Sequence, residues 1–185
     1  VFLFALILCG NMFNLIASYN PGTSWRNLYS LVGVKNDSTL IAWGDNQSGG
    51  GFPNHMTNLN HNIKSVYSTA QATAALKYDG TVIAWGKNTH GGIIPSGGLT
   101  NVVTIYSTTQ AFTALKSDGT IQSWGNSNYG GNSPSGLISV TSVYATSGAF
   151  TALKSDGTVE CWGHFNTGGN TPSGLTNVQS VFSTD

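Results

Sequence analysis

Charged side chains are scarce in this sequence. Only 8% of the 185 residues are Asp, Glu, Lys or Arg, and the seven basic and seven acidic residues cancel. Nucleic-acid-binding proteins neutralise phosphates with clustered Lys and Arg, so this composition gives nucleic-acid binding no electrostatic support. So weakly charged a surface is also poorly defended against association with other proteins or with copies of itself.

Cysteine is nearly absent, with only Cys9 and Cys161. Two cysteines are too few for a disulfide framework, and nothing in their spacing argues for a bridge between them. Aromatic residues, by contrast, make up 11% of the chain, and apolar residues recur in register. This composition supports a packed core and excludes a disordered chain.

The usual signatures of catalysis are also missing. Glu160 is the only glutamate, and it has no evident acid partner for general acid–base chemistry. No serine lies in a Gly-x-Ser-x-Gly elbow, and no Gly-rich loop leads into Lys-Ser or Lys-Thr. His55 and His61 are six residues apart without a nearby cysteine or carboxylate, which is a weak metal signal. We expect a non-enzymatic protein without catalytic, cofactor-binding or metal-binding residues.

What the sequence does contain is internal repetition. The stretch AFTALKSDGTIQSWG, residues Ala111 to Gly125, recurs almost unchanged from Ala149 to Gly163. Looser copies run from Ala72 to Gly86 and from Leu31 to Gly44. Repetition at a fixed period indicates a repeat architecture. The repeat landmarks, to which we assign structural roles, are Trp43, Trp85, Trp124 and Trp162, with the turn pairs Asp79-Gly80, Asp118-Gly119 and Asp156-Gly157.

Each full unit contains three short predicted strands, exemplified by Val103–Ser107, Ala111–Lys116 and Thr120–Trp124. The Asp-Gly pair between the second and third strands supplies the positive φ angles that a two-residue hairpin requires. In the first unit Ser38 replaces this glycine, so we expect that turn to be looser or differently built. The second strand is apolar or small on both faces, which predicts a strand sandwiched between layers.

A polar, Gly-rich segment follows each Trp-Gly pair and is predicted to be a loop. The first residue of this loop differs from unit to unit, although the framework around it repeats. Varied residues on a repeated scaffold are where a repeat protein places its binding surface, with drift in unconstrained loops as the alternative. The candidate interaction residues are Asp45, Lys87, Asn126 and His164.

The N-terminal run Val1 to Ala17 is almost entirely apolar and resembles the hydrophobic region of a secretory signal. Three interpretations stay open: it packs against its own domain, docks into a neighbouring subunit, or anchors the chain in a membrane. Membrane contact would therefore run only through residues 1–17. We divide the chain into an apolar segment, 1–23, and a repeat domain, 24–185, and expect a secreted or cell-surface protein. Asn36 and Asn46 begin candidate glycosylation sequons.

The repeat A-L-K-x-D-G-T-V-x-x-W-G-x-N-x-x-G-G, followed by P-S-G-L and V-x-S-V-Y-S-T, resembles the regulator of chromosome condensation repeat family. The likeness is greatest to the short-repeat branch that includes propeller-type β-lactamase inhibitors, and it covers roughly Leu31 to Asp185. The resemblance implies a β-propeller with binding functions: nucleotide exchange on a small GTPase, protease or lactamase inhibition, or scaffolding. The shared repeat residues carry none of these functions.

We therefore expect an all-β repeat protein of three-stranded antiparallel blades, with four units plus a fragment at Ser180 to Asp185. Four units cannot close the seven-bladed ring typical of the family, which needs roughly 270 residues at this period. The chain is a piece of a longer protein, a small four-bladed ring, or an open array that stacks with copies of itself.

The leading functional hypothesis is a secreted or surface structural protein that self-associates into a filament or ring. Assembly would use the repeat ends and the N-terminal apolar segment, so the expected partner is the chain itself or another protein. The alternative is a fragment of a soluble protein-binding propeller of the inhibitor or exchange-factor type.

Overall fold

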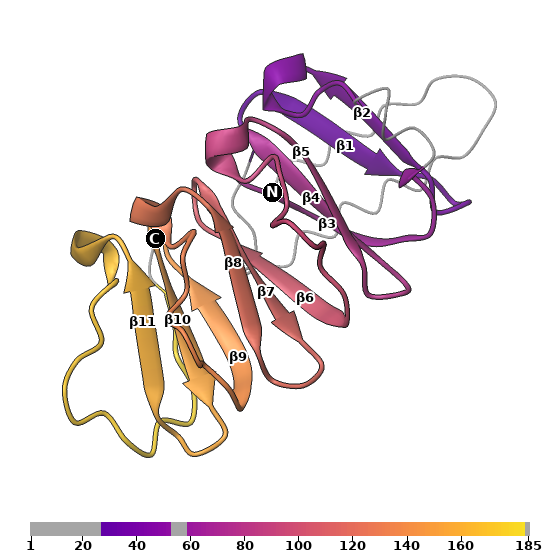
Figure 1. Ribbon diagram of the computed structural model, residues 1–185. Helices are drawn as coiled ribbons and strands as arrows, with labels where there is room; N and C mark the ends of the chain where they lie inside the picture. The colour runs from indigo at the N-terminus through magenta and orange to yellow at the C-terminus, as the bar shows by residue number, and fades with distance from the viewer. Residues whose placement is uncertain (1–26, 53–58, 184–185) are drawn as a thin grey trace.

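The computed structural model describes residues 27–52 and 59–183. The described residues form eleven short strands in four antiparallel sheets, together with four three-residue 3-10 helices. Figure 1 shows the sheets stacked face against face in chain order. The N-terminal apolar run, Cys9 and the start of the predicted repeat domain at residue 24 lie outside the described residues.

The strands follow the predicted repeat closely. Each of the last three sheets has three strands, and its middle strand is also the second in sequence, which confirms the predicted antiparallel blades. The first sheet has only two strands among the described residues. The sheets are β1 (Ser30–Val34) with β2 (Leu40–Gly44); β3 (Ile63–Ser68), β4 (Ala72–Lys77) and β5 (Val82–Gly86); β6 (Val102–Ser107), β7 (Ala111–Lys116) and β8 (Ile121–Gly125); and β9 (Val140–Ala145), β10 (Ala149–Lys154) and β11 (Val159–Gly163).

The core lies between successive sheets. All six residues of the middle strand β4 are buried, which confirms that this strand is sandwiched between layers. Its neighbour β7 buries Phe112, whose ring stacks on Trp124 with 5.1 Å between centroids. Burying one such aromatic side chain contributes roughly 1.5–3 kcal/mol. Small alanines at several buried positions of these two strands, including Ala74 and Ala114, let adjacent sheets approach closely.

The hairpins between second and third strands differ from the predicted two-residue turn. In the third sheet, the Gly119 N–H donates to the Lys116 carbonyl (3.0 Å) and the Lys116 N–H donates to the Thr120 carbonyl (2.9 Å). Gly119 alone has a positive φ (77°), so the loop is a three-residue turn that ends in a left-handed glycine. Asp118 keeps a negative φ because its carboxylate accepts hydrogen bonds from the Thr120 N–H and hydroxyl.

The first hairpin is built in the same way as the others, so the expectation of a looser turn was wrong. The Ser38 N–H donates to the Lys35 carbonyl at 2.8 Å, and the Lys35 N–H donates to the Thr39 carbonyl at 2.8 Å. Ser38 adopts φ 60°, the left-handed conformation that glycine takes elsewhere. An L residue in that region costs roughly 1–2 kcal/mol. The hydrogen bonds of the hairpin therefore impose this conformation on a serine.

A row of backbone hydrogen bonds links successive sheets. The N–H of Leu28 donates to the Ala70 carbonyl (3.2 Å), Ala70 donates to Thr109 (2.9 Å), and Thr109 donates to Ser147 (2.9 Å). These four residues hold equivalent repeat positions, so each blade bonds the next at the same point. A second repeated bond joins the Val102 N–H to the Gly80 carbonyl (3.0 Å), and it recurs as Val178 to Gly157 (2.9 Å) just before the predicted fragment of a fifth unit. Residues 178–183 nevertheless form no strand.

Candidate functional site

Four 3-10 helices lie side by side at one end of the stack, which we call the rim (Figure 1). Each helix follows the last strand of its sheet, and the first three helices contact the last strand of the next sheet along the chain. The hairpins that contain the Asp-Gly turns lie at the opposite end. The rim helices are η1 (Asn46–Ser48), η3 (Asn88–His90), η4 (Ser127–Tyr129) and η5 (Phe165–Thr167).

A left-handed glycine ends every rim helix. Its φ angle is 96° at Gly49, 94° at Gly91, 92° at Gly130 and 100° at Gly168. Glycine is required by close packing as well as by the backbone conformation, because a Cβ at Gly91 would lie 2.6 Å from Cδ2 of Phe112 in the next sheet. The rim is thus fitted tightly to the blade that follows it.

The repeated tryptophans fasten the first three rim helices to the next blade. The indole N–H of Trp85 donates to the Gly49 carbonyl at 2.9 Å, and Trp124 bonds Gly91 in the same way at 3.0 Å. Trp162 repeats the bond to Gly130 at 3.0 Å, and all three indoles are buried. Trp43 is different: no described blade precedes it, and 43% of its surface is exposed. Trp85, Trp124 and Trp162 therefore stabilise the packing between blades.

In each three-stranded sheet, a threonine between the first and middle strands bonds the rim helix. The Thr69 hydroxyl donates to the His90 carbonyl (3.0 Å), Thr108 donates to Tyr129 (2.9 Å), and Thr146 donates to Thr167 (2.7 Å). In the first sheet the Asn27 side-chain amide donates to the Ser48 carbonyl in their place. Sequence reasoning missed these residues, although the threonine recurs in the same repeat position. The equivalent positions are Asn27, Thr69, Thr108 and Thr146.

The structure brings the four candidate interaction residues to equivalent rim positions, directly before each helix. Asp45 and Asn126 cap their helices by accepting the N–H of Gln47 (3.4 Å) and of Asn128 (3.0 Å). The other two make no such cap. The Lys87 ammonium instead donates to the Gln71 side chain at 2.8 Å.

His164 lies in a small aromatic cluster at the end of the rim. Its ring stacks on Phe165 with centroids 5.2 Å apart and lies 6.1 Å from the ring of Tyr129. Its Nδ1 is buried, with no hydrogen-bond partner among the described residues. Phe165 itself is 65% exposed. An exposed aromatic ring backed by a stacked histidine is the kind of group that anchors a protein interface.

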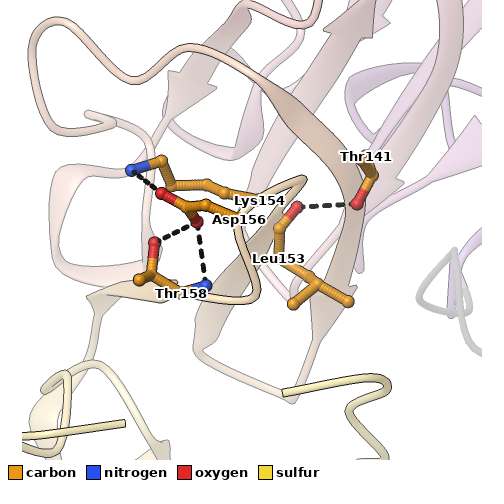
Figure 2. Close-up of polar contacts among 5 residues, drawn as sticks. All are labelled: Thr141, Leu153, Lys154, Asp156 and Thr158. Carbon is orange, nitrogen blue, oxygen red and sulfur yellow. Dashed lines mark hydrogen bonds and ion pairs between the residues drawn. The ribbon is translucent and has the colours of Figure 1, made fainter. Parts of the chain in front are cut away.

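The two ends of the stack differ in variability. At the hairpin end, Asp79, Asp118 and Asp156 each accept hydrogen bonds from the threonine two residues later. Figure 2 shows this for Asp156, whose carboxylate also lies 3.6 Å from the Lys154 ammonium. The threonine hydrogen bonds lower the pKa of each of these carboxyls. The hairpin end thus repeats one structure, whereas the rim presents different side chains on each blade.

Other candidate groups occupy scattered positions. Asn36 and Asn46, which begin the two sequons, are both exposed. The Cys161 thiol lies 3.2 Å from the Thr151 hydroxyl. Within residues 27–52 and 59–183, no group of three or more His, Cys, Asp or Glu could hold a metal ion. In the same residues no helix has the length and apolar character that crossing a membrane requires.

Comparison with known proteins identifies the repeat. The family model described as the regulator of chromosome condensation (RCC1) repeat matches residues 63–91, from β3 to the glycine after η3. A search of curated proteins finds no match. Yeast RCC1 (Prp20), solved in complex with Kap60, superposes with a TM-score of 0.58 at 16% identity over 94% of this chain and 50% of that chain.

Two further solved structures share the fold. Prp20p from Saccharomyces cerevisiae, described together with its binding to Gsp1p and histones, has a TM-score of 0.53 at 18% identity over 82% of this chain and 48% of that chain. The ectodomain of the Physcomitrella patens receptor kinase CR4 has a TM-score of 0.53 at 21% identity over 75% and 39%. The chain thus spans between two fifths and half of the length of these structures.

The stacked antiparallel blades define a protein of the β-propeller class. The regulator of chromosome condensation (RCC1) repeat model matches the second blade, and the stack shares the fold of yeast RCC1 (Prp20), in agreement with the sequence resemblance. Membership of the short-repeat, inhibitor-like branch stays a prediction.

Proposed function

We propose that this chain is a non-enzymatic protein-interaction module and that its rim binds a protein partner. The observation that carries this proposal is the contrast between a constant framework and variable side chains. Tryptophan–glycine bonds hold the first three rim helices and threonine–carbonyl bonds the last three, yet Asp45, Lys87, Asn126 and His164 precede the four helices. Such an arrangement presents a different recognition group on each blade of one rigid surface.

The composition of the rim supports a protein partner. Its exposed tips carry small polar side chains such as Gln47, Thr89 and Asn128, with Phe165 as an exposed aromatic group. Asp45 and Lys87 carry opposite charges, and the pKa of His90 is lowered by burial and then by Lys87, so the rim carries little net charge. Protein interfaces combine a few aromatic anchors with polar surroundings in this way.

The structural neighbours support the same role. Prp20p is described with its binding to Gsp1p and histones, and yeast RCC1 was solved bound to Kap60. These partners belong to those proteins. For this chain they favour a binding role over a catalytic one, without naming the partner.

A photo-crosslinking experiment tests the rim. A photoreactive amino acid is placed at Asn128 on the rim or at Tyr78 on a hairpin of the opposite end, and adducts from a cell extract are identified by mass spectrometry. We expect defined protein adducts from position 128 and none from position 78. A Phe165→Ala variant should then weaken binding of the captured protein at least about tenfold, while Tyr78→Ala should not. Equal adducts from both ends would contradict the proposal.

We also propose that the protein acts outside the cell. The apolar composition of residues 1–17, the exposure of Asn36 and Asn46, and the fold likeness to a receptor ectodomain support this location. Expression in eukaryotic cells with glycosidase treatment tests it. We expect secreted protein whose mass falls after treatment and is unchanged in the doubly substituted Asn36→Gln, Asn46→Gln variant. Retention of unglycosylated protein inside the cell would contradict this proposal.

Self-association is a second candidate function, and a specific observation favours it. The first sheet exposes apolar side chains on its outward face, with Leu31 60% exposed and Trp43 43% exposed. A large exposed apolar face marks an association surface. Light scattering of the full chain should show particles larger than one chain, and deletion of Val1 to Ala17 should reduce them. A monomer at every concentration would exclude this function.

A further inference from the structure

The three joints between successive sheets follow one rule. In each joint the later sheet presents a tryptophan, and the earlier sheet presents the carbonyl of the left-handed glycine after its rim helix. The space above that glycine is occupied by the later sheet as well: a Cβ at Gly130 would lie 2.5 Å from Cδ2 of Phe150. A joint therefore needs two complementary surfaces. One is the sheet face that carries the tryptophan, which we call the tryptophan face. The other is the left-handed glycine with its carbonyl and the space above it, which we call the glycine socket.

The first sheet presents a tryptophan face without a described partner. Leu31 and Trp43 pair across the hairpin, and Gly33 pairs with Ile41, so these side chains share one face. In the second sheet the equivalent face, which includes Ile83 and Trp85, is buried against the first sheet. The face that includes Leu31 and Trp43 is thus built like the buried face of every later blade.

The fourth sheet presents the complementary socket. A Cβ at Gly168 would meet nothing within 4 Å, although its φ of 100° matches that of the occupied glycines. Leu175 is 43% exposed, whereas its repeat equivalent Leu99 is buried in the core between the second and third sheets. The described end of the stack therefore has the shape and the backbone acceptor that a tryptophan face uses.

We propose that the first sheet of one copy docks on the fourth sheet of a second copy, head to tail. The Trp43 indole of one copy donates to the Gly168 carbonyl of the other, and Leu31 packs beside Leu175, so the contact repeats the internal joint. Because the two faces differ, the contact is heterologous, and it propagates into a closed ring or an open filament. This inference rests on the second candidate function and names the residues that perform it.

Two variants of the full chain test the contact. Leu31→Asp places a charge on the tryptophan face, and Leu175→Asp places one beside the socket. Both positions are exposed in the single chain, so the substitutions leave folding intact. Tyr78→Asp is the matched control, because Tyr78 is 70% exposed on a hairpin away from both faces. Circular dichroism checks the fold of each variant, and analytical ultracentrifugation measures mass.

The expected result is specific to a head-to-tail contact. The wild type and Tyr78→Asp form multiples of the 19.4 kDa chain. Each Asp variant alone is monomeric, with a dissociation constant raised at least about tenfold by the desolvated charge. An equimolar mixture of the two forms a dimer, because each variant keeps the face that the other needs.

Two outcomes would overturn the inference, and they separate it from self-association in general. If the wild type assembles but the mixture of Leu31→Asp and Leu175→Asp stays monomeric, the head-to-tail pairing is wrong and self-association stands on another surface. If the wild type is monomeric at every concentration, both the head-to-tail pairing and the second candidate function are wrong. Neither outcome affects binding by the rim, which uses different residues.

Discussion

The indole nitrogen of Trp124 lies 3.0 Å from the carbonyl oxygen of Gly91, 33 residues earlier in the chain. Gly91 ends the rim helix of the second sheet, and Trp124 belongs to the last strand of the third. One hydrogen bond thus joins two blades and fixes the rim helix at the same time. The repeated framework of the candidate site and the packing of the fold depend on the same pair.

Replacing Trp124 by phenylalanine tests the strength of this joint. The variant loses the indole donor and leaves a buried carbonyl without its partner, so we expect a loss of roughly 1–3 kcal/mol in the free energy of unfolding. Urea denaturation at a concentration at which the chain is monomeric measures it. Trp43→Phe is the control, since Trp43 is largely outside the core. Its free energy of unfolding should fall by no more than about 0.5 kcal/mol. Equal losses in both variants would show that the joint contributes nothing.

Ser38 is a site where a substitution should stabilise the protein. Glycine adopts its φ of 60° without the steric cost that an L residue pays, although the unfolded chain gains entropy. We expect Ser38→Gly to raise the free energy of unfolding by roughly 0.5–1 kcal/mol. The reverse change in an equivalent turn, Gly119→Ser, should lower it by a similar amount. Thermal denaturation of both variants checks the pair, and a destabilised Ser38→Gly would contradict the account of this turn.

Thr73 is buried, and its hydroxyl has no hydrogen-bond partner among the described residues. The equivalent positions in the next two blades carry Phe112 and Phe150. Valine has nearly the same shape and no polar atom, so Thr73→Val should stabilise the fold by roughly 1 kcal/mol. The matched control is Thr113→Val, because the Thr113 hydroxyl pairs with Ser123 at 2.8 Å. Chemical denaturation should show a higher free energy of unfolding for Thr73→Val and a lower one for Thr113→Val than for the wild type.

The hairpin carboxyls predict sensitivity to acid. The side-chain bond from Thr120, and next its backbone N–H, lower the pKa of Asp118 below its ordinary value of 3.8. A carboxyl whose pKa is lower in the folded state stabilises the protein above the unfolded pKa, and this contribution is lost as pH falls through the folded pKa. Unfolding free energies measured from pH 7 to pH 2 should therefore decline below about pH 4. The decline should be smaller in Thr120→Val, and an identical decline would exclude this hydrogen bond as its cause.

Local sequence patterns were sufficient to place most strands. Ala111–Lys116 was located to the residue, because small and apolar side chains between two turn signals leave few other options. The turn itself was predicted less well. Asp118 keeps a negative φ because its carboxylate bonds Thr120, a contact that the preference of Asp-Gly for two-residue hairpins does not include.

The candidate site shows the same division. The variable positions Lys87 and Asn126 were found from sequence, because the framework around them repeats. That they lie in one row could not be inferred from residue order alone, since it depends on how one blade stacks on the next. The threonine anchors, such as Thr108 to the Tyr129 carbonyl, were missed because a hydroxyl that bonds a carbonyl 21 residues away leaves no local pattern.

The sequence by itself determined that this protein is a β repeat, with its period, its strands and the positions of its loops, because these follow from local preferences that recur unit after unit. Tertiary structure alone decided which groups meet across blades: Trp85 with Gly49, the uncovered Trp43, and the open glycine at Gly168. The physical reason is that packing and hydrogen bonding between blades act over more than thirty residues of chain. Such contacts depend on the stacking geometry of whole sheets rather than on the preference of any single residue.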